Sequence, residues 1–387
     1  MNKKFETNAI RTQVKRTENL EHSVPMYLTS SFVFEDAEDM RASFAEEKDR
    51  NIYSRYSNPN SSEFIEKVCQ MEGAEAGFAF ASGMAAVFST FAALLESGDH
   101  ILAARNIFGS THSLFTNFFP KWNISHSYFK IHELDSIEKS ILPNTKILYA
   151  ESPTNPGVDV LDLEVLGKIA KKHNLIFIVD NCFASPYLQQ PIKFGADLVI
   201  HSGTKLMDGQ GRVLAGITVG SKELIEKVYR FSRITGPALS PFNAWVLSKS
   251  LETLAVRVDR HCENALKLAE FLESHEKINW VKYPFLKSHP KYEIAKKQMK
   301  AGGCVVAFEV KGGLEAGQKF FDSIKLLSLS ANLGDSRSIV THPASTTHSK
   351  LTSEERQETG ITDGMVRVSV GLEHIDDIIG DIEQALS

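Results

Sequence analysis

An acid and a lysine follow two β-prone runs of the chain. Residues 175–179 are all apolar and end at Asp180, and residues 198–202 lead through Gly203-Thr204 to Lys205. Ligands of parallel α/β sheets bind beyond the carboxyl ends of the strands. A carboxylate at the tip of a buried strand needs a partner, and a partly desolvated lysine can lose its proton and form a Schiff base with an aldehyde. The two residues therefore predict one shared site for a ligand with an aldehyde group.

The hydroxyls near Lys205 indicate which aldehyde this is. Ser202 and Thr204 suit a phosphate, and Asp180 against a pyridine nitrogen would keep the ring protonated and able to accept electrons from a substrate carbanion. This combination predicts pyridoxal phosphate. A surface lysine and a capping aspartate are the alternative interpretation, but their joint position at strand ends favours the functional one.

A second phosphate-binding element is predicted upstream, where the run 77–81 leads to Ser82-Gly83-Met84 and an apolar helix. Backbone N–H groups at such a helix start bind phosphate oxygens, and glycine permits close approach. The same turn is also typical of an ordinary helix start. The chain has no G-x-x-x-x-G-K-[ST] loop, and its cysteines and histidines lack zinc-ligand spacing, so neither a nucleotide loop nor a metal site is expected.

The elements that must position these residues alternate along the chain. Between about residues 64 and 220, helical stretches separate β-rich runs, which predicts an α/β fold with a mainly parallel sheet; the runs are 77–81, 101–104, 147–151, 175–180, 198–201 and 214–219. Asp162 precedes an apolar stripe that ends in a cationic turn before Asn174, as expected of a helix.

Three regions are predicted from these patterns. Residues 1–50 form a polar N-terminal arm for subunit contacts, and residues 51–250 form the large domain that binds the cofactor. Residues 251–387 form a smaller α/β domain, in which strands at 304–310 and 366–370 flank a helix near 314–327. A long helical zone spans about residues 240–275.

Composition excludes several classes of function. The 387 residues are 42% hydrophobic and 24% charged, as in folded globular proteins, and the net charge of −5 provides no field for nucleic acid or an anionic membrane. Four distant cysteines and an N-terminus without an apolar core favour a cytoplasmic protein with reduced thiols. Residues 76–95 lack charge over the length of a membrane span, but Ser82-Gly83 interrupts them, which favours a buried strand and helix.

Together these motifs resemble the transsulfuration group of pyridoxal-phosphate enzymes of cysteine and methionine metabolism, which have the aspartate-aminotransferase-like fold type I. The resemblance covers about residues 24–385, and its most specific part is the lysine motif at 197–216. It implies that Lys205 forms the Schiff base and that Asp180 pairs with the pyridine nitrogen. It also implies a phosphate site made by Ser82, Gly83, Met84, Ser202 and Thr204.

Other positions take their implied roles from the same resemblance. The stretch 51–59 is similar to the Tyr-x-Arg element that reaches the phosphate from a neighbouring subunit, which implies that Tyr53 and Arg55 complete shared sites in a homotetramer, a dimer of dimers. In Glu151-Ser-Pro-Thr-Asn-Pro156, Asn155 would approach the ring oxygen. Arg367 would clamp the substrate α-carboxylate, which suits its bidentate fork.

Two departures narrow the choice within the group. Where many members have a tyrosine that stacks on the cofactor, this chain has Phe108, which can stack but cannot exchange protons. Where synthases and lyases tend to read Ser-Leu-Gly-Gly-x-Glu-Ser, residues 332–338 read Asn-Leu-Gly-Asp-Ser-Arg-Ser, which looks like the sulfhydrylases that use inorganic sulfide. With the stretch 208–212, these features most resemble O-succinylhomoserine sulfhydrylases.

The expected activity is therefore a γ-replacement in methionine biosynthesis, catalysed by a transferase that converts O-succinylhomoserine and sulfide to homocysteine and succinate. Asn332 and Arg367 are expected to bind the substrate, and Arg337 is a candidate for the distal carboxylate; it could equally be a surface arginine satisfied by Asp335. The alternatives are cystathionine γ-synthase, O-acetylhomoserine sulfhydrylase and methionine γ-lyase. A non-catalytic cofactor carrier and a nucleotide-binding regulator are less favoured.

Overall fold

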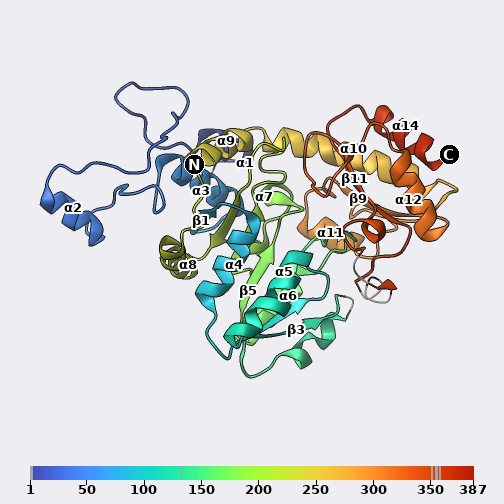
Figure 1. The fold of residues 1–387 in the computed structure, drawn as a ribbon, viewed down its shortest axis with the longest axis horizontal. Helices are drawn as coiled ribbons and strands as arrows, with labels where there is room; N and C mark the ends of the chain where they lie inside the picture. Colours follow the sequence, from blue (N-terminus) through green and yellow to red (C-terminus); the bar gives the residue numbers. More distant parts are fainter. Residues whose placement is uncertain (1–2, 132, 350–351, 354–355, 357–358) are drawn as a thin grey trace.

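In the computed structural model, which describes residues 3–131, 133–349, 352–353, 356 and 359–387, the apolar runs form a seven-stranded sheet with the order β1-β7-β6-β5-β4-β2-β3 (Figure 1). The strands are β1 (Ala76–Phe80), β2 (His100–Ala104), β3 (Ser125–Phe129), β4 (Thr145–Glu151), β5 (Ile176–Asp180), β6 (Leu198–Ser202) and β7 (Gly216–Gly220). β3, β2, β4, β5 and β6 pair in parallel, which confirms the predicted α/β fold with a mainly parallel sheet.

β7 departs from the parallel pattern, because it is antiparallel to both β6 and β1. The loop between β6 and β7 contains no helix, so the chain turns back beside β6 without the crossover that a parallel pair requires. β3 was not expected from the sequence. Its polar residues pair with β2 alone, at the edge of the sheet.

The helices of this part of the chain are α3 (Pro59–Glu72), α4 (Gly83–Leu94), α5 (Gly109–Ser113), α6 (Leu163–Lys172), α7 (Ser185–Leu188), α8 (Lys222–Thr235) and α9 (Pro241–Leu251). Of these, α3, α4, α6 and α8 pack directly on strands of the sheet. The Asp162 side chain accepts a hydrogen bond from Val165 N at 3.1 Å and caps α6, as its sequence predicts. Residues 76–95 form β1 and α4 rather than one long helix. Among the described residues, none of the helices combines the length and the apolarity needed to span a membrane.

A second, five-stranded sheet lies in the C-terminal part of the described chain, in the order β10-β11-β12-β9-β8. It comprises β8 (Ile278–Lys282), β9 (Val305–Val310), β10 (Ser328–Leu329), β11 (Ile339–Thr341) and β12 (Met365–Ser369), with helices α10 (Leu254–Glu273), α11 (Tyr292–Gln298), α12 (Gly313–Ser323) and α14 (Ile375–Leu386). The helical zone expected at 240–275 is therefore two helices, α9 and α10.

The N-terminal segment contains α1 (Phe5–Arg11) and α2 (Ala37–Phe44), joined by irregular chain. Figure 1 shows α2 extended away from both sheets, at the far left of the view. The boundaries at residues 50 and 250 stay predictions.

Candidate active site

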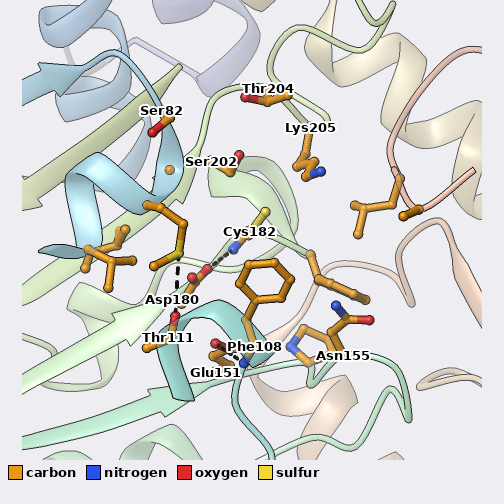
Figure 2. Close-up of a pocket in the computed structure, with 18 of the residues that line it drawn as sticks. Ser82, Phe108, Thr111, Glu151, Asn155, Asp180, Cys182, Ser202, Thr204 and Lys205 are labelled. Atoms are coloured by element: carbon orange, nitrogen blue, oxygen red, sulfur yellow. Dashed lines mark hydrogen bonds between the residues drawn. The ribbon is translucent and has the colours of Figure 1, made fainter. Parts of the chain in front are cut away.

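A cavity of about 290 Å³ lies at the carboxyl ends of β4, β5 and β6 (Figure 2). Its lining includes ten of the residues that the sequence singles out: Ser82, Gly83, Met84, Phe108, Asn155, Asp180, Ser202, Thr204, Lys205 and Arg367. They come from both sheets and from the loops around them. The cavity therefore brings together the acid, the lysine, the hydroxyls and the arginine that the separate motifs supply.

Lys205 occupies the turn after β6, and its amine donates a hydrogen bond to Oδ1 of Asn332, 2.5 Å away. Burial lowers the pKa of this amine; the neighbouring Cys182 opposes that shift, and the charge of Arg367 adds to it. The shift increases the fraction of neutral amine at a given pH, and only the neutral amine is a nucleophile or a base.

A buried arginine of α10 holds the backbone of this turn in place. Arg257 donates to the carbonyl oxygens of Leu206 at 2.8 Å and Met207 at 3.3 Å, and also to that of Ser250 at 2.9 Å. Gly209 has a φ of +68°, and a Cβ at this position would lie 1.9 Å from the Arg257 guanidinium. The turn that carries Lys205 is thus fixed by contacts with a helix outside the large sheet.

Asp180 is the last residue of β5, and its Oδ1 accepts a hydrogen bond from the backbone N–H of Cys182 at 2.9 Å. Burial raises the pKa of this carboxyl to about 6, although the Cys182 N–H, His201 and Tyr149 act in the opposite direction. A cation placed against Asp180 would offset most of the cost of burying its negative charge. A protonated pyridine nitrogen is such a cation.

Hydroxyls and helix N–H groups line the side of the cavity nearest α4. The Ser82 side chain accepts from Ala85 N at 3.1 Å and so caps α4, while Gly83 lies so close to Ser202 that a Cβ would come within 2.9 Å of the serine Cβ. The Thr204 hydroxyl accepts from Ala215 N at 3.0 Å and donates to its carbonyl at 3.3 Å. Hydroxyls beside a glycine-started helix of 12 residues suit a phosphate group.

Arg367 of β12 enters the cavity from the second sheet. Its guanidinium donates to Oδ1 of Asn155 and to the carbonyl of Asn332, both at 2.9 Å. Burial lowers its pKa to about 10, so it remains cationic at neutral pH. A buried, oriented guanidinium is well suited to a carboxylate.

Four predicted residues are not among those that line this cavity. One of them, Asn332, contacts two residues that do, Lys205 and Arg367. Tyr53 and Arg55 lie beside a separate surface hollow that Leu28 and Phe242 also line, and the Arg55 guanidinium donates to the carbonyl of Arg233. Arg337 pairs with Asp335 at 3.1 Å, and 68% of its side chain is exposed. The roles expected for these four stay predictions.

The cavity also contains residues that the sequence analysis did not single out, among them Glu151, Thr111 and Cys182. Glu151 ends β4 in the same way that Asp180 ends β5. It carries the same sequence signal as Asp180, a carboxylate directly after an apolar run, here residues 147–150.

Comparisons with known proteins agree with this chemistry. The family model described as Cys/Met metabolism PLP-dependent enzyme matches residues 6–387. The chain is 45% identical to O-succinylhomoserine sulfhydrylase of Pseudomonas aeruginosa, over 99% of this chain and 95% of that protein. It is 43% identical to L-methionine gamma-lyase of Fusobacterium nucleatum subsp. polymorphum, over 94% of this chain and 93% of that protein.

A solved structure adds the cofactor. The putative O-acetylhomoserine (thiol)-lyase of Campylobacter jejuni is 37% identical, with a TM-score of 0.94 over 99% of this chain and 100% of that one, and it carries N'-pyridoxyl-lysine-5'-monophosphate. The amine, carboxylate and hydroxyls around the cavity fit the aldehyde, the pyridine nitrogen and the phosphate of this group. The predicted resemblance and cofactor are thereby confirmed. The chain belongs to the family of Cys/Met metabolism PLP-dependent enzymes, whose cofactor is pyridoxal 5'-phosphate.

Proposed function

We propose that the chain is an O-succinylhomoserine sulfhydrylase, which replaces the succinate of O-succinylhomoserine with sulfide and releases homocysteine. The observation that carries this proposal is the convergence of Lys205, Asp180 and Arg367 on one cavity, in a chain 45% identical to a sulfhydrylase of that name. The direct test measures homocysteine formation from sulfide with the succinyl and acetyl esters of homoserine in parallel. A preference for the acetyl ester would contradict the proposal.

Each part of the cofactor has candidate partners in this proposal. Lys205 would hold the aldehyde carbon and Asp180 the pyridine nitrogen, and Phe108 would stack on the ring with Asn155 near the ring oxygen. The phosphate would be bound by Ser82, Gly83, Met84, Ser202 and Thr204. Bound pyridoxal phosphate supplies an electron sink for carbanions formed at the substrate carbons.

Lys205 carries the proton transfers in this scheme. Because burial favours its neutral form, the amine can take the proton from the substrate Cα and later return it. Phe108 has no hydroxyl and cannot take part in these proton transfers. Arg367 fixes the substrate carboxylate, and Asn332 contacts both Arg367 and Lys205, so the carboxylate and the base are held in one geometry.

A test of the lysine assignment follows from its chemistry. The purified protein should be yellow, and borohydride should attach the cofactor to Lys205 irreversibly, because reduction yields a stable secondary amine. Lys205→Ala should lose both this attachment and essentially all turnover. A colourless and fully active protein would contradict the assignment.

Methionine γ-lyase activity is the second candidate, favoured by the 43% identity to an enzyme of that name. A lyase needs no sulfide, so incubation with methionine alone separates the two. Release of methanethiol and ammonia at a rate above that of homocysteine synthesis would favour the lyase.

The assembly and location belong to the same proposal. We infer a cytoplasmic homotetramer in which Tyr53 and Arg55 reach the phosphate of a neighbouring subunit. The assembly is supported by the similarity of residues 51–59 to the Tyr-x-Arg element. Exposed apolar side chains on the N-terminal segment also support it, such as Leu28, which is 66% exposed, and Val33, which is 88% exposed.

A further inference from the structure

Two carboxylates lie side by side in the cavity. Glu151 ends β4, Asp180 ends β5, and the two residues pair directly in the parallel register of these strands. Paired positions on neighbouring strands are about 4.8 Å apart across the sheet, and both side chains line the same cavity (Figure 2). Two buried negative charges at that spacing strongly disfavour each other, so the pair keeps a proton.

The surroundings of the two carboxyls differ. Asp180 accepts the Cys182 N–H, and the charge of His201 also favours its ionised form. Glu151 is only 5% exposed, and its described hydrogen-bond donors are neutral: the Phe108 backbone N–H at 2.7 Å and the Tyr149 hydroxyl at 3.4 Å. Both of those hydrogen bonds end on Oε1, which leaves Oε2 to carry a proton.

We propose that Glu151 is a permanently protonated acid in the cofactor pocket, that it positions Phe108 through the Phe108 backbone N–H, and that Asp180 alone carries the negative charge of the pair. The ring of Phe108 lines the cavity beside this carboxyl, as Figure 2 shows. Glu151 is therefore a positioning residue for the ring expected to stack on the cofactor. The proposal depends on the cofactor and not on which ester or nucleophile the enzyme uses.

The electrostatics of the pocket agree with this assignment. The titratable groups that act on Glu151 or are acted on by it are Tyr149 on its own strand, Asp180 on β5 and Cys182. Two cations, Lys205 and Arg367, line the same cavity. Burial is the main cause that raises the pKa of Glu151 well above its usual range, and the charge of Asp180 adds to it.

The test uses two isosteric variants of the holoenzyme. Glu151→Gln keeps an oxygen for the Phe108 N–H and replaces the acid O–H with an amide N–H, so it mimics a protonated glutamic acid. It should change the dissociation constant of pyridoxal phosphate by less than about twofold, whereas the matched Asp180→Asn should weaken binding by tenfold or more, as expected for the loss of a charge-assisted hydrogen bond of about 1.5–3 kcal/mol. Glu151→Ala removes the acceptor and should weaken the visible circular dichroism of the bound cofactor, which Glu151→Gln restores.

Infrared difference spectra provide a readout that does not involve turnover. At neutral pH the parent minus Glu151→Gln spectrum should contain the carbonyl band of a protonated carboxylic acid, and the parent minus Asp180→Asn spectrum should contain carboxylate bands instead. Absence of the acid band at Glu151, or cofactor binding as weak in Glu151→Gln as in Asp180→Asn, would overturn the proposal. Failure with every ester would leave this result unchanged and would count against the proposed function alone.

Discussion

The side-chain oxygen of Asn332 accepts a hydrogen bond from the amine of Lys205 at 2.5 Å, and the backbone carbonyl oxygen of Asn332 accepts one from Arg367 at 2.9 Å. Lys205 follows β6 of the seven-stranded sheet, whereas Asn332 lies between β10 and β11 of the five-stranded sheet. One residue from a loop of the second sheet therefore contacts both the expected base and the expected carboxylate clamp.

Asn332→Asp is predicted to place a carboxylate against the Lys205 amine. An opposite charge at hydrogen-bond distance favours the protonated form of the Lys205 nitrogen by about 1 to 3 pKa units, so the variant should need a higher pH to release that proton. In the holoenzyme this nitrogen is expected to belong to the Schiff base with the cofactor, and a pH titration of the visible absorbance follows its proton, with Asn332→Ser as the uncharged control. Identical titration curves for the two variants would show that the contact has no electrostatic effect on Lys205.

Asp180 is predicted to make the apoprotein less stable as the pH rises. Its pKa increases from 3.8 to about 6 on folding, so the folded apoprotein binds the proton more tightly than the unfolded chain does. This contribution to the free energy of unfolding is fully present below about pH 4 and is lost as the pH rises through about 6. The loss is at most about 3 kcal/mol.

Asp180→Asn cannot ionise and should lack this part of the pH dependence. The unfolding free energy of the apoprotein in urea, measured at several pH values, should therefore fall less steeply for the variant than for the parent between about pH 4 and 6. Equal slopes for the two proteins would mean that Asp180 has an ordinary pKa in the apoprotein.

Gly209→Ala is predicted to disturb the turn that carries Lys205. The new Cβ would meet the Arg257 guanidinium at 1.9 Å, in addition to the strain of a φ of +68°. Gly313 has the same φ of +68° with nothing within 4 Å, so Gly313→Ala measures the backbone strain alone, about 1–2 kcal/mol. Urea unfolding should show a clearly larger loss at Gly209, with weaker cofactor binding there only. Equal losses of stability would show that the Arg257 side chain moves aside at no energetic cost.

The sequence located the side of the cavity formed by the large sheet because of a general property of parallel sheets. Asp180, Ser202 and Lys205 all follow apolar runs, and the carboxyl ends of parallel strands meet at one edge of the sheet. The direction of β7 could not be predicted, because hydrophobic patterning does not encode strand direction. The edge strand β3 could not be predicted from its hydrophobic pattern, because its residues, Ser-His-Ser-Tyr-Phe, are mostly polar.

Sequence patterns cannot predict hydrogen bonds between side chains that are far apart in the chain. The bond from Lys205 to Asn332 joins residues 127 positions apart, and the bond from Arg367 to Asn155 joins residues 212 apart. The approach of Asn332 and Asn155 to these side chains depends on how the two sheets pack, and local periodicity carries no information about that packing.

Tyr53 and Arg55 are predicted to act in the site of another subunit. Arg55→Ala and Lys205→Ala should each be inactive as homo-oligomers, yet mixed oligomers should regain activity because a hybrid contains some sites with both residues intact. The mixture is refolded together, hybrids are verified by native mass spectrometry, and turnover is measured. Hybrids without activity would indicate that Arg55 serves only its own subunit, where it contacts the carbonyl of Arg233.

The last prediction concerns the distal carboxylate of a succinyl ester. Arg337 is proposed to attract it, since a site that selects succinyl over acetyl needs a cation that only one ester uses. In the chain itself Arg337 pairs with Asp335 at 3.1 Å; the arginine side chain is 68% exposed and the aspartate side chain only 9%. Because the backbone N–H of Arg337 and the Ser336 hydroxyl also donate to Asp335 Oδ1, at 3.0 and 3.3 Å, Asp335 keeps hydrogen bonds when the Arg337 guanidinium turns to a substrate carboxylate.

Arg337→Ala should lower kcat/KM for O-succinylhomoserine by roughly tenfold, about 1.4 kcal/mol, and leave the value for the acetyl ester nearly unchanged. Arg230→Ala is the matched control, because Arg230 is also a surface arginine, 69% exposed and paired with Glu226. An equal loss for both esters would assign Arg337 to the structure of its own loop, since removing its charge would then act through Asp335, whose side chain is only 9% exposed, rather than through the substrate.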